Sequence, residues 1–156
     1  MKFTHTCNFH ETLDLNKIAP IQNAGWNKPC GGIWLSINEG WEHWCEYEMP
    51  EWLIGIRYEF KLKPNAKVYW ITEDIHAKVL PDNPKTEDEV FQLCTGMKFI
   101  DFEKVAENYD AIAVMIQSGN ISRRLLDGWD CDSMVVFNPD IIESFEVTEE
   151  YKKETK

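Results

Sequence analysis

The segment that most constrains the fold is a run of four apolar residues, Met134 to Phe137, between polar neighbours. A run this short, stopped by Asn138-Pro139, predicts a buried β-strand, because a buried helix needs a longer run and proline cannot continue a strand ladder. Asp132 and Ser133 stand where this strand begins. Carboxylate and hydroxyl groups at the mouth of a core strand are either ordinary solvated loop residues or parts of an active site.

The rest of the chain predicts short strands and a few helices. Alternating polar and apolar residues predict a first strand at 2–7, and the ranges 55–63 and 67–72 predict a hairpin. Further strands are expected at 31–37, 111–116, 133–137 and 142–148, and helices at 39–49, 73–80, 86–94 and 102–109. Many short, mostly antiparallel strands with helices at the margins define an α+β class. We expect one domain at 1–150 and a solvated tail at 151–156, since no repeat or linker divides the chain.

The net charge and the cysteines bear on the partners and the cellular location of the protein. The 156-residue chain has a formal net charge of −11, which disfavours non-specific binding to nucleic acid or to an anionic membrane. Its five cysteines form no Cys-x-x-Cys pair, and the sequence has neither an apolar leader nor an apolar window of membrane-spanning length. These features predict reduced thiols, a cytoplasmic protein without a membrane partner, and no metal site. The chain also lacks the glycine-rich turn of P-loop and Rossmann domains.

Several residues could carry chemistry, although each also has a structural interpretation. His5 alternates with apolar neighbours on the first expected strand, where a histidine is more often part of the core than catalytic. Gly32 would let a ligand or another backbone approach closely, or would merely lead into a strand. Trp34 could stack on a flat ligand ring or pack in the core. Asp130 and Asp132 could form a carboxylate pair or the charged rim of a loop.

Taken in chain order, three segments resemble the ADP-ribosyltransferase superfamily. They are Phe-Thr-His-Thr at 3–6, Gly-Gly-Ile-Trp-Leu-Ser at 31–36 ahead of a tryptophan-bearing helix, and Asp-Ser-Met-Val-Val-Phe-Asn-Pro-Asp-Ile-Ile at 132–142. The likeness is to the branch with a His-Tyr-Glu signature, which includes the poly-ADP-ribose polymerases and diphtheria-toxin-like toxins. The resemblance implies split antiparallel β-sheets with peripheral helices, and NAD as the substrate.

The resemblance also implies which residues would bind NAD, namely His5, Thr6, Gly32, Trp34, Ser36 and Arg123. His5 would hydrogen-bond the ribose next to nicotinamide, and the backbone of Thr6 would pair with the nicotinamide carboxamide. Trp34 takes the place of the family's tyrosine as a stacking ring. Arg123 would meet the NAD pyrophosphate or an anionic acceptor, although a surface salt bridge is an equally good interpretation.

The family's catalytic glutamate has no direct counterpart. In strict alignment it falls on Ser133, and Asp132 stands one residue earlier, where a strand directs its side chain to the opposite face. Either a β-bulge turns Asp132 into the cleft or the site has lost its acid. An acid matters there because breaking the nicotinamide–ribose bond builds positive charge on the ribose, which a carboxylate stabilises.

The function implied by the resemblance is a mono-ADP-ribosyltransferase that transfers ADP-ribose from NAD to a protein side chain or a nucleic-acid base. His5, Asp132 and Ser133 are its candidate catalytic residues. Such a protein would be a toxin-like effector of a bacterium or phage, with a cognate antitoxin or a host target as a further partner. The alternative is a catalytically degenerate binding module, or an inhibitor that occludes a partner.

Overall fold

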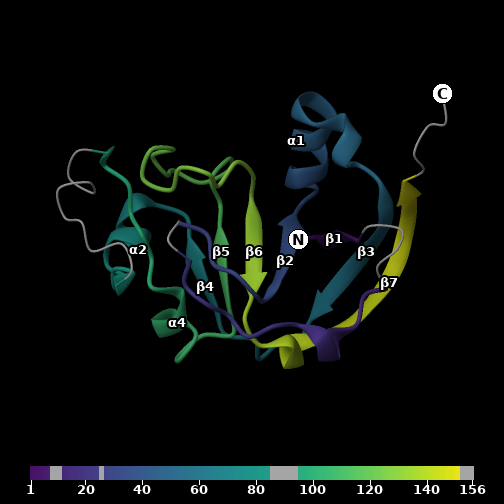
Figure 1. Cartoon of the computed structure of the whole chain (residues 1–156), viewed down its shortest axis with the longest axis horizontal. Coiled ribbons are helices and arrows are strands. Elements are labelled where there is room, and N and C mark those ends of the chain that lie inside the picture. Colours follow the sequence, from purple (N-terminus) through teal and green to yellow (C-terminus); the bar gives the residue numbers. More distant parts are fainter. Residues whose placement is uncertain (8–11, 25–26, 85–94, 152–156) are drawn as a thin grey trace.

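The computed structural model describes residues 1–7, 12–24, 27–84 and 95–151, which form an α+β domain around one seven-stranded sheet (Figure 1). The strand order is β4-β5-β6-β2-β1-β3-β7. The strands are β1 (Phe3–Cys7), β2 (Ile33–Ile37), β3 (Gly55–Leu62), β4 (Val68–Ile71), β5 (Ala111–Val114), β6 (Ser133–Val136) and β7 (Ile142–Tyr151). The helices are α1 (Gly40–Glu48), α2 (Asp74–Lys78) and α4 (Phe102–Val105), with 3₁₀ turns η1 (Leu15–Lys17), η2 (Pro50–Trp52) and η4 (Pro139–Ile141).

The expected class and most of the expected strands are confirmed. All neighbouring strands are antiparallel except β4 and β5, which are parallel. The expected helix at 86–94 lies outside the described residues. Tyr151, the first residue of the tail expected at 151–156, is the last residue of the edge strand β7, and residues 152–156 lie outside the described residues.

The hairpin predicted from 55–63 and 67–72 is wrong. β3 pairs with β1 on one edge and with β7 on the other, so neither edge is open to β4. β4 instead pairs in parallel with β5. A parallel pair needs a crossover connection, which the segment 72–110 with α2 and α4 supplies.

The apolar runs at 111–116 and 134–137 form the centre of the core. All four residues of β5 and all four of β6 are buried. Apart from Ser133, their side chains alternate between two apolar clusters, one on each face of the sheet. The buried strand predicted from Met134 to Phe137 is therefore confirmed, with Phe137 half-buried just beyond its end.

The shortest pairing between neighbouring strands of the sheet is that of β1 with β2. β1 pairs with β3 along its full length, from Phe3 to Cys7, but with β2 only at Phe3 and Thr4. Figure 1 shows β2 and β3 leaning apart, with α1 at the open end. The expectation of separate split sheets is thus corrected to one hydrogen-bonded sheet that opens along the β1–β2 pairing.

Candidate functional site

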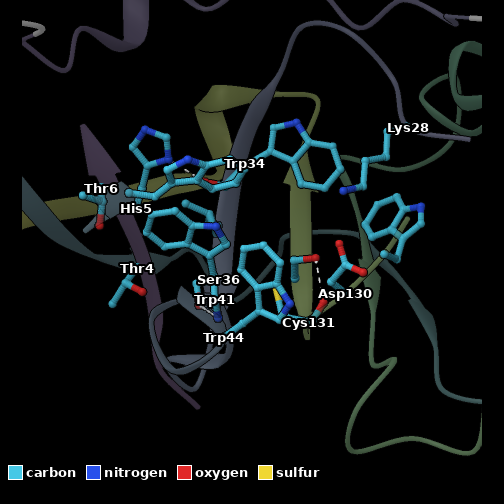
Figure 2. A pocket seen from close by; sticks show the side chains of 14 residues that line it. Thr4, His5, Thr6, Lys28, Trp34, Ser36, Trp41, Trp44, Asp130 and Cys131 are labelled. Carbon is cyan, nitrogen blue, oxygen red and sulfur yellow. Dashed lines mark hydrogen bonds between the residues drawn. The ribbon is translucent and has the colours of Figure 1, made fainter. Parts of the chain in front are cut away.

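A cleft of about 410 Å³ opens where β1 and β2 separate, and we call it the β1–β2 cleft. Its size is that of a small-molecule site, and its wall is mainly apolar with a few polar groups. The lining residues are Thr4, His5, Thr6, Lys28, Trp34, Leu35, Ser36, Trp41, Trp44, Trp52, Trp129, Asp130, Cys131 and Ser133. Figure 2 shows Thr4, His5 and Thr6 at one side of the cleft and Lys28 and Asp130 at the other.

His5 is held in a defined orientation by a bond across the gap. Its Nδ1 lies 2.7 Å from the carbonyl oxygen of Trp34. A carbonyl can only accept, so Nδ1 carries the proton and donates, and Nε2 is the acceptor nitrogen of the neutral ring. The Phe60 ring packs edge-on at 6.5 Å between centroids. His5 therefore joins the two strands with its side chain just where their backbone pairing ends.

Tryptophan dominates the wall of the β1–β2 cleft. Among the residues that the structure describes, five tryptophans line it, from β2, α1, η2 and the connection before β6. Trp34 packs against Trp129 with 4.9 Å between ring centroids, and the Trp129 indole N–H donates to the carbonyl of Asn27. Trp44 and Trp52 form a second tilted pair at 5.8 Å. Stacking surfaces for flat rings are thus present on more than one side.

The sequence predicted Trp34 as a cleft residue and missed the other four tryptophans. A signal for two of them existed, because Trp41 and Trp44 share a helix face three residues apart directly after β2. Such a pattern is usually core, and only the position of α1 over the open end of the sheet places these rings at the cleft.

A buried carboxylate lies beneath the cleft floor. Glu42 is only 2% exposed, and its two oxygens accept hydrogen bonds from the hydroxyls of Ser36, at 2.7 Å, and Thr4. The Ser36 oxygen also accepts from the backbone N–H of Trp41 at 3.0 Å. Both hydroxyl residues line the cleft, so Glu42 is hydrogen-bonded to two residues of its lining.

The turn from β2 into α1 brings Glu42 to this place. Asn38 and Glu39 both adopt left-handed backbone conformations, with φ of 50° and 60°, and fold α1 back over the sheet. Glu42 then stands in the first turn of α1, on the same face as the buried Cys45. Sequence reasoning missed Glu42, because an acid on a short helix is ordinarily solvated.

At the mouth of β6 it is Ser133 that faces the cleft. Ser133 lies opposite Ser36 in regular register, and the ladder continues with the Ile37 N–H donating to the carbonyl of Asp132 at 3.0 Å. The Ser133 hydroxyl donates to the carbonyl of Cys131 at 3.0 Å. No extra residue enters β6 here, so the β-bulge considered for Asp132 is absent from this strand end.

Asp132 points to the other side of β6. Its carboxylate accepts from the Gln117 N–H at 2.7 Å and from the Ser118 hydroxyl at 2.6 Å, and its side chain does not line the cleft. Of the two alternatives for Asp132, the structure therefore does not have the bulge that would turn this side chain into the cleft, and the assignment of Asp132 as a catalytic residue is corrected. Neighbouring strand residues face opposite sides, and the loop N–H groups hold this carboxylate in place.

The remaining predicted residues divide into two groups. Thr6 lines the cleft, and its hydroxyl oxygen is buried without a hydrogen-bond partner among the described residues. Gly32 and Arg123 do not line it. Gly32 has φ of +66°, and a Cβ there would lie 2.7 Å from the carbonyl oxygen of Val136, so glycine serves the close approach of β6. Arg123 is exposed on the connection 117–131, whereas Lys28, which sequence reasoning missed, supplies a cation at the cleft.

The cysteine in the cleft is not set up as a nucleophile. Burial raises the pKa of the Cys131 thiol from its ordinary 9.0 to about 12. The thiolate, which is the reactive form, is then scarce at neutral pH.

Three further observations concern the whole described chain. No group of three or more His, Cys, Asp and Glu side chains in the described ranges is arranged to hold a metal ion. Among the described helices, none has the length and apolar character needed to cross a bilayer. Comparison with models of known protein families, with curated proteins and with solved structures found no match.

Proposed function

We propose that the β1–β2 cleft binds NAD and that the protein is a mono-ADP-ribosyltransferase with a macromolecular acceptor. One observation carries this proposal: the three segments that resemble the superfamily meet at one cleft. His5 and Thr6 come from β1, Trp34 and Ser36 from β2, and Ser133 from β6. β6, β2 and β1 are neighbours in the sheet although more than a hundred residues separate the first segment from the last.

The fold supports the same proposal. The resemblance implies antiparallel strands that separate to admit the dinucleotide. In this sheet the backbone pairing of β1 with β2 ends at Thr4, and beyond it the side chain of His5 bonds to the Trp34 carbonyl. The ADP-ribosyltransferase fold is part of the proposal, as is the identification of this opening with its NAD groove.

Each lining group has a task in this proposal. Trp34 offers a ring face to the nicotinamide, and the acceptor nitrogen of His5 takes a hydrogen bond from a ribose hydroxyl. Lys28 takes the role predicted for Arg123 and meets the pyrophosphate. Thr6 contributes backbone contacts to the carboxamide.

The reaction breaks the bond between ribose C1′ and the nicotinamide nitrogen, and nicotinamide leaves with the electron pair. A lone pair of the acceptor forms the new bond to C1′, and the acceptor's proton passes to water. Because positive charge develops on the ribose, negative charge near the cleft lowers the barrier. The acceptor is a protein side chain or a nucleic-acid base, and a cognate antitoxin or host target would follow from a toxin-like role.

A second candidate is a binding module that holds NAD and does not cleave it. Ser133 favours this candidate, because it occupies the strand position at which the family carries its acid. The two candidates share the cleft and differ only in turnover.

Calorimetry with NAD tests binding, which both candidates require. Release of free nicotinamide distinguishes the enzyme from the binding module. We expect binding by the wild type, a loss of roughly tenfold in affinity for His5→Ala, and no change for His43→Ala, an exposed histidine on α1. No binding at millimolar NAD contradicts both candidates. Labelled NAD incubated with cell lysate, followed by nuclease or protease, then identifies the class of acceptor.

A further inference from the structure

The second tryptophan pair of the β1–β2 cleft reaches the protein surface. Trp44 of α1 and Trp52 of η2 lie 5.8 Å apart between ring centroids, and Trp52 is 49% exposed. Tyr47, in the turn of α1 that follows Trp44, is 85% exposed. Large exposed aromatic rings gathered at one place mark a binding surface rather than ordinary solvated surface. We call Trp44, Tyr47, Glu48, Glu51 and Trp52 the α1–η2 patch.

The α1–η2 patch carries negative charge that no basic side chain neutralises. Glu48 follows Trp44 by one helical turn, so the two share a face of α1, and Glu51 directly precedes Trp52 in η2. Both glutamates are exposed, and none of the ion pairs among the described residues includes either of them. The sequence has no lysine or arginine in the range 29–56. The exposed rings therefore have free carboxylates beside them.

The other tryptophan pair of the cleft has a cation of its own. Lys28 Nζ lies 5.8 Å from the centre of the Trp34 ring, against which Trp129 packs. Within the described part of the chain, no lysine or arginine makes such a contact with Trp44 or Trp52. The faces of tryptophan rings attract cations. Rings without a cation, flanked by unpaired carboxylates, are complementary to a cation that another molecule brings.

We propose that the α1–η2 patch binds an arginine side chain of a partner protein. A guanidinium is planar, so it stacks on an indole face while its edge donates to carboxylates, whereas a lysine ammonium is compact and strongly hydrated. Nucleic acid fits the patch less well, because its phosphates would meet the free carboxylates. A second copy of this chain is also disfavoured, since each copy has a net charge of −11.

This inference goes beyond the NAD site and does not depend on it. The patch lies at the mouth of the β1–β2 cleft, because Trp44 and Trp52 belong both to the patch and to the cleft lining. A partner held there by an arginine is placed beside the cleft. Joined to the proposed transferase, the inference therefore makes the acceptor a protein rather than a nucleic acid.

Titration with short peptides, followed by NMR chemical shifts, tests the proposal without NAD. The probes are an acetylated and amidated glycine–arginine peptide and the same peptide with citrulline or lysine in place of arginine. Citrulline keeps the planar shape and removes the charge. We expect the arginine peptide to bind about tenfold more tightly than the citrulline peptide and about threefold more tightly than the lysine peptide. Raised salt should weaken its binding.

Two variants of Trp52 test the aromatic part of the patch. Trp52→Ala should weaken binding of the arginine peptide about tenfold, and Trp52→Phe should keep it within about threefold of wild type, because a ring face remains. Trp70→Ala is the matched control. Trp70 is a 36% exposed tryptophan on the edge strand β4, and its loss should leave the affinity unchanged.

Two double variants test the charge. Glu48→Gln with Glu51→Gln should weaken binding of the arginine peptide about fivefold and reduce its dependence on salt. Glu146→Gln with Glu150→Gln changes the net charge by the same amount on β7 and is the control. All four glutamates are exposed and outside the ion pairs of the described residues, so both double variants should fold.

Several results would overturn the inference. It is wrong if the arginine peptide does not bind at millimolar concentration, or if the citrulline or lysine peptide binds equally well. Unchanged affinity in Trp52→Ala contradicts the aromatic contact. Equal losses in the two double variants would show that net charge, and not the patch, attracts the peptide. Tighter binding of a short oligothymidylate than of the arginine peptide would assign the patch to nucleic acid. A failure of NAD to bind bears on the proposed function alone.

Discussion

His5 Nδ1 lies 2.7 Å from the carbonyl oxygen of Trp34, one residue beyond the last backbone pair between β1 and β2. This single side-chain bond joins the strands at the point where they part. It fixes the proton on Nδ1 and keeps both residues at the wall of the cleft. The residue proposed to bind the ribose thus also closes the edge of the opening.

Replacing His5 by alanine therefore has two effects. NAD affinity should fall roughly tenfold through the lost hydrogen bond, and the free energy of unfolding should fall by about 1 kcal/mol because the Trp34 carbonyl loses its donor. Calorimetry and urea denaturation measure the two changes. The exposed His43→Ala variant should alter neither, and an unchanged NAD affinity in His5→Ala would contradict the assigned role.

Replacing Asp132 by alanine should destabilise the protein without removing NAD binding. The 6% exposed carboxylate holds Gln117 and Ser118 in place, and losing charged hydrogen bonds of this kind costs about 2 kcal/mol. Urea denaturation measures the loss. Asp130→Ala, at an exposed aspartate that lines the cleft, should change stability by less than about 0.5 kcal/mol. A variant at Asp132 with normal stability and no NAD affinity would show that the carboxylate reaches the ligand.

Replacing Ser133 by glutamate should increase nicotinamide release. Ser133 lies opposite Ser36 at the floor of the cleft, so the longer side chain brings a carboxylate to the place where charge develops. A well-placed charged group raises the rate of such a reaction by about 10²-fold, and we expect Ser133→Glu to give a smaller increase than this. Ser133→Gln has nearly the same shape without the charge and is the control. Equal release by both variants, measured by chromatography, would contradict this placement.

Alkaline pH should destabilise the fold through its buried thiols. Burial raises the pKa of Cys131 from 9.0 to about 12 and that of Cys45 from 9.0 to about 11. Above pH 9 the unfolded chain loses these protons while the folded chain keeps them, so unfolding is favoured as pH rises toward about 11 to 12. The loss approaches about 1.4 kcal/mol per pH unit for Cys131. Denaturation between pH 8 and 10.5 measures it, and Cys131→Ala should flatten the slope.

Thiol labelling checks the same burial independently. At pH 8 iodoacetamide should modify Cys30, which is exposed, and spare Cys131 in the native protein. Peptide mass spectrometry identifies the labelled residues. Rapid native labelling of Cys131 would show that the cleft leaves this thiol accessible and ionised.

The fold was predictable where one local pattern dominated. The apolar runs at 111–116 and 134–137 supply all of β5 and three of the four residues of β6, because a short stretch with no polar residue is satisfied when both faces of a sheet bury it. The prediction of a hairpin from 55–63 and 67–72 was wrong for a non-local reason. Which strand pairs with β4 depends on the edges that β1 and β7 have already taken, and no turn signal carries that information.

The site shows the same division. Through the resemblance of three short segments to one family, the sequence made His5, Thr6, Trp34, Ser36 and Ser133 candidates for one binding site. Gly32, Arg123 and Asp132 were candidates on the same ground and do not line the cleft. Only the tertiary structure decided that Ser133 faces the cleft and Asp132 does not, that four more tryptophans join the wall, and that Glu42 lies under the floor. Local sequence sets which residue types alternate along a strand. Whether Asp132 or Ser133 faces the cleft depends on the register of β6 with β2, about a hundred residues away. The burial of Glu42 depends on the hydroxyls of Thr4 and Ser36, which β1 and β2 bring to it.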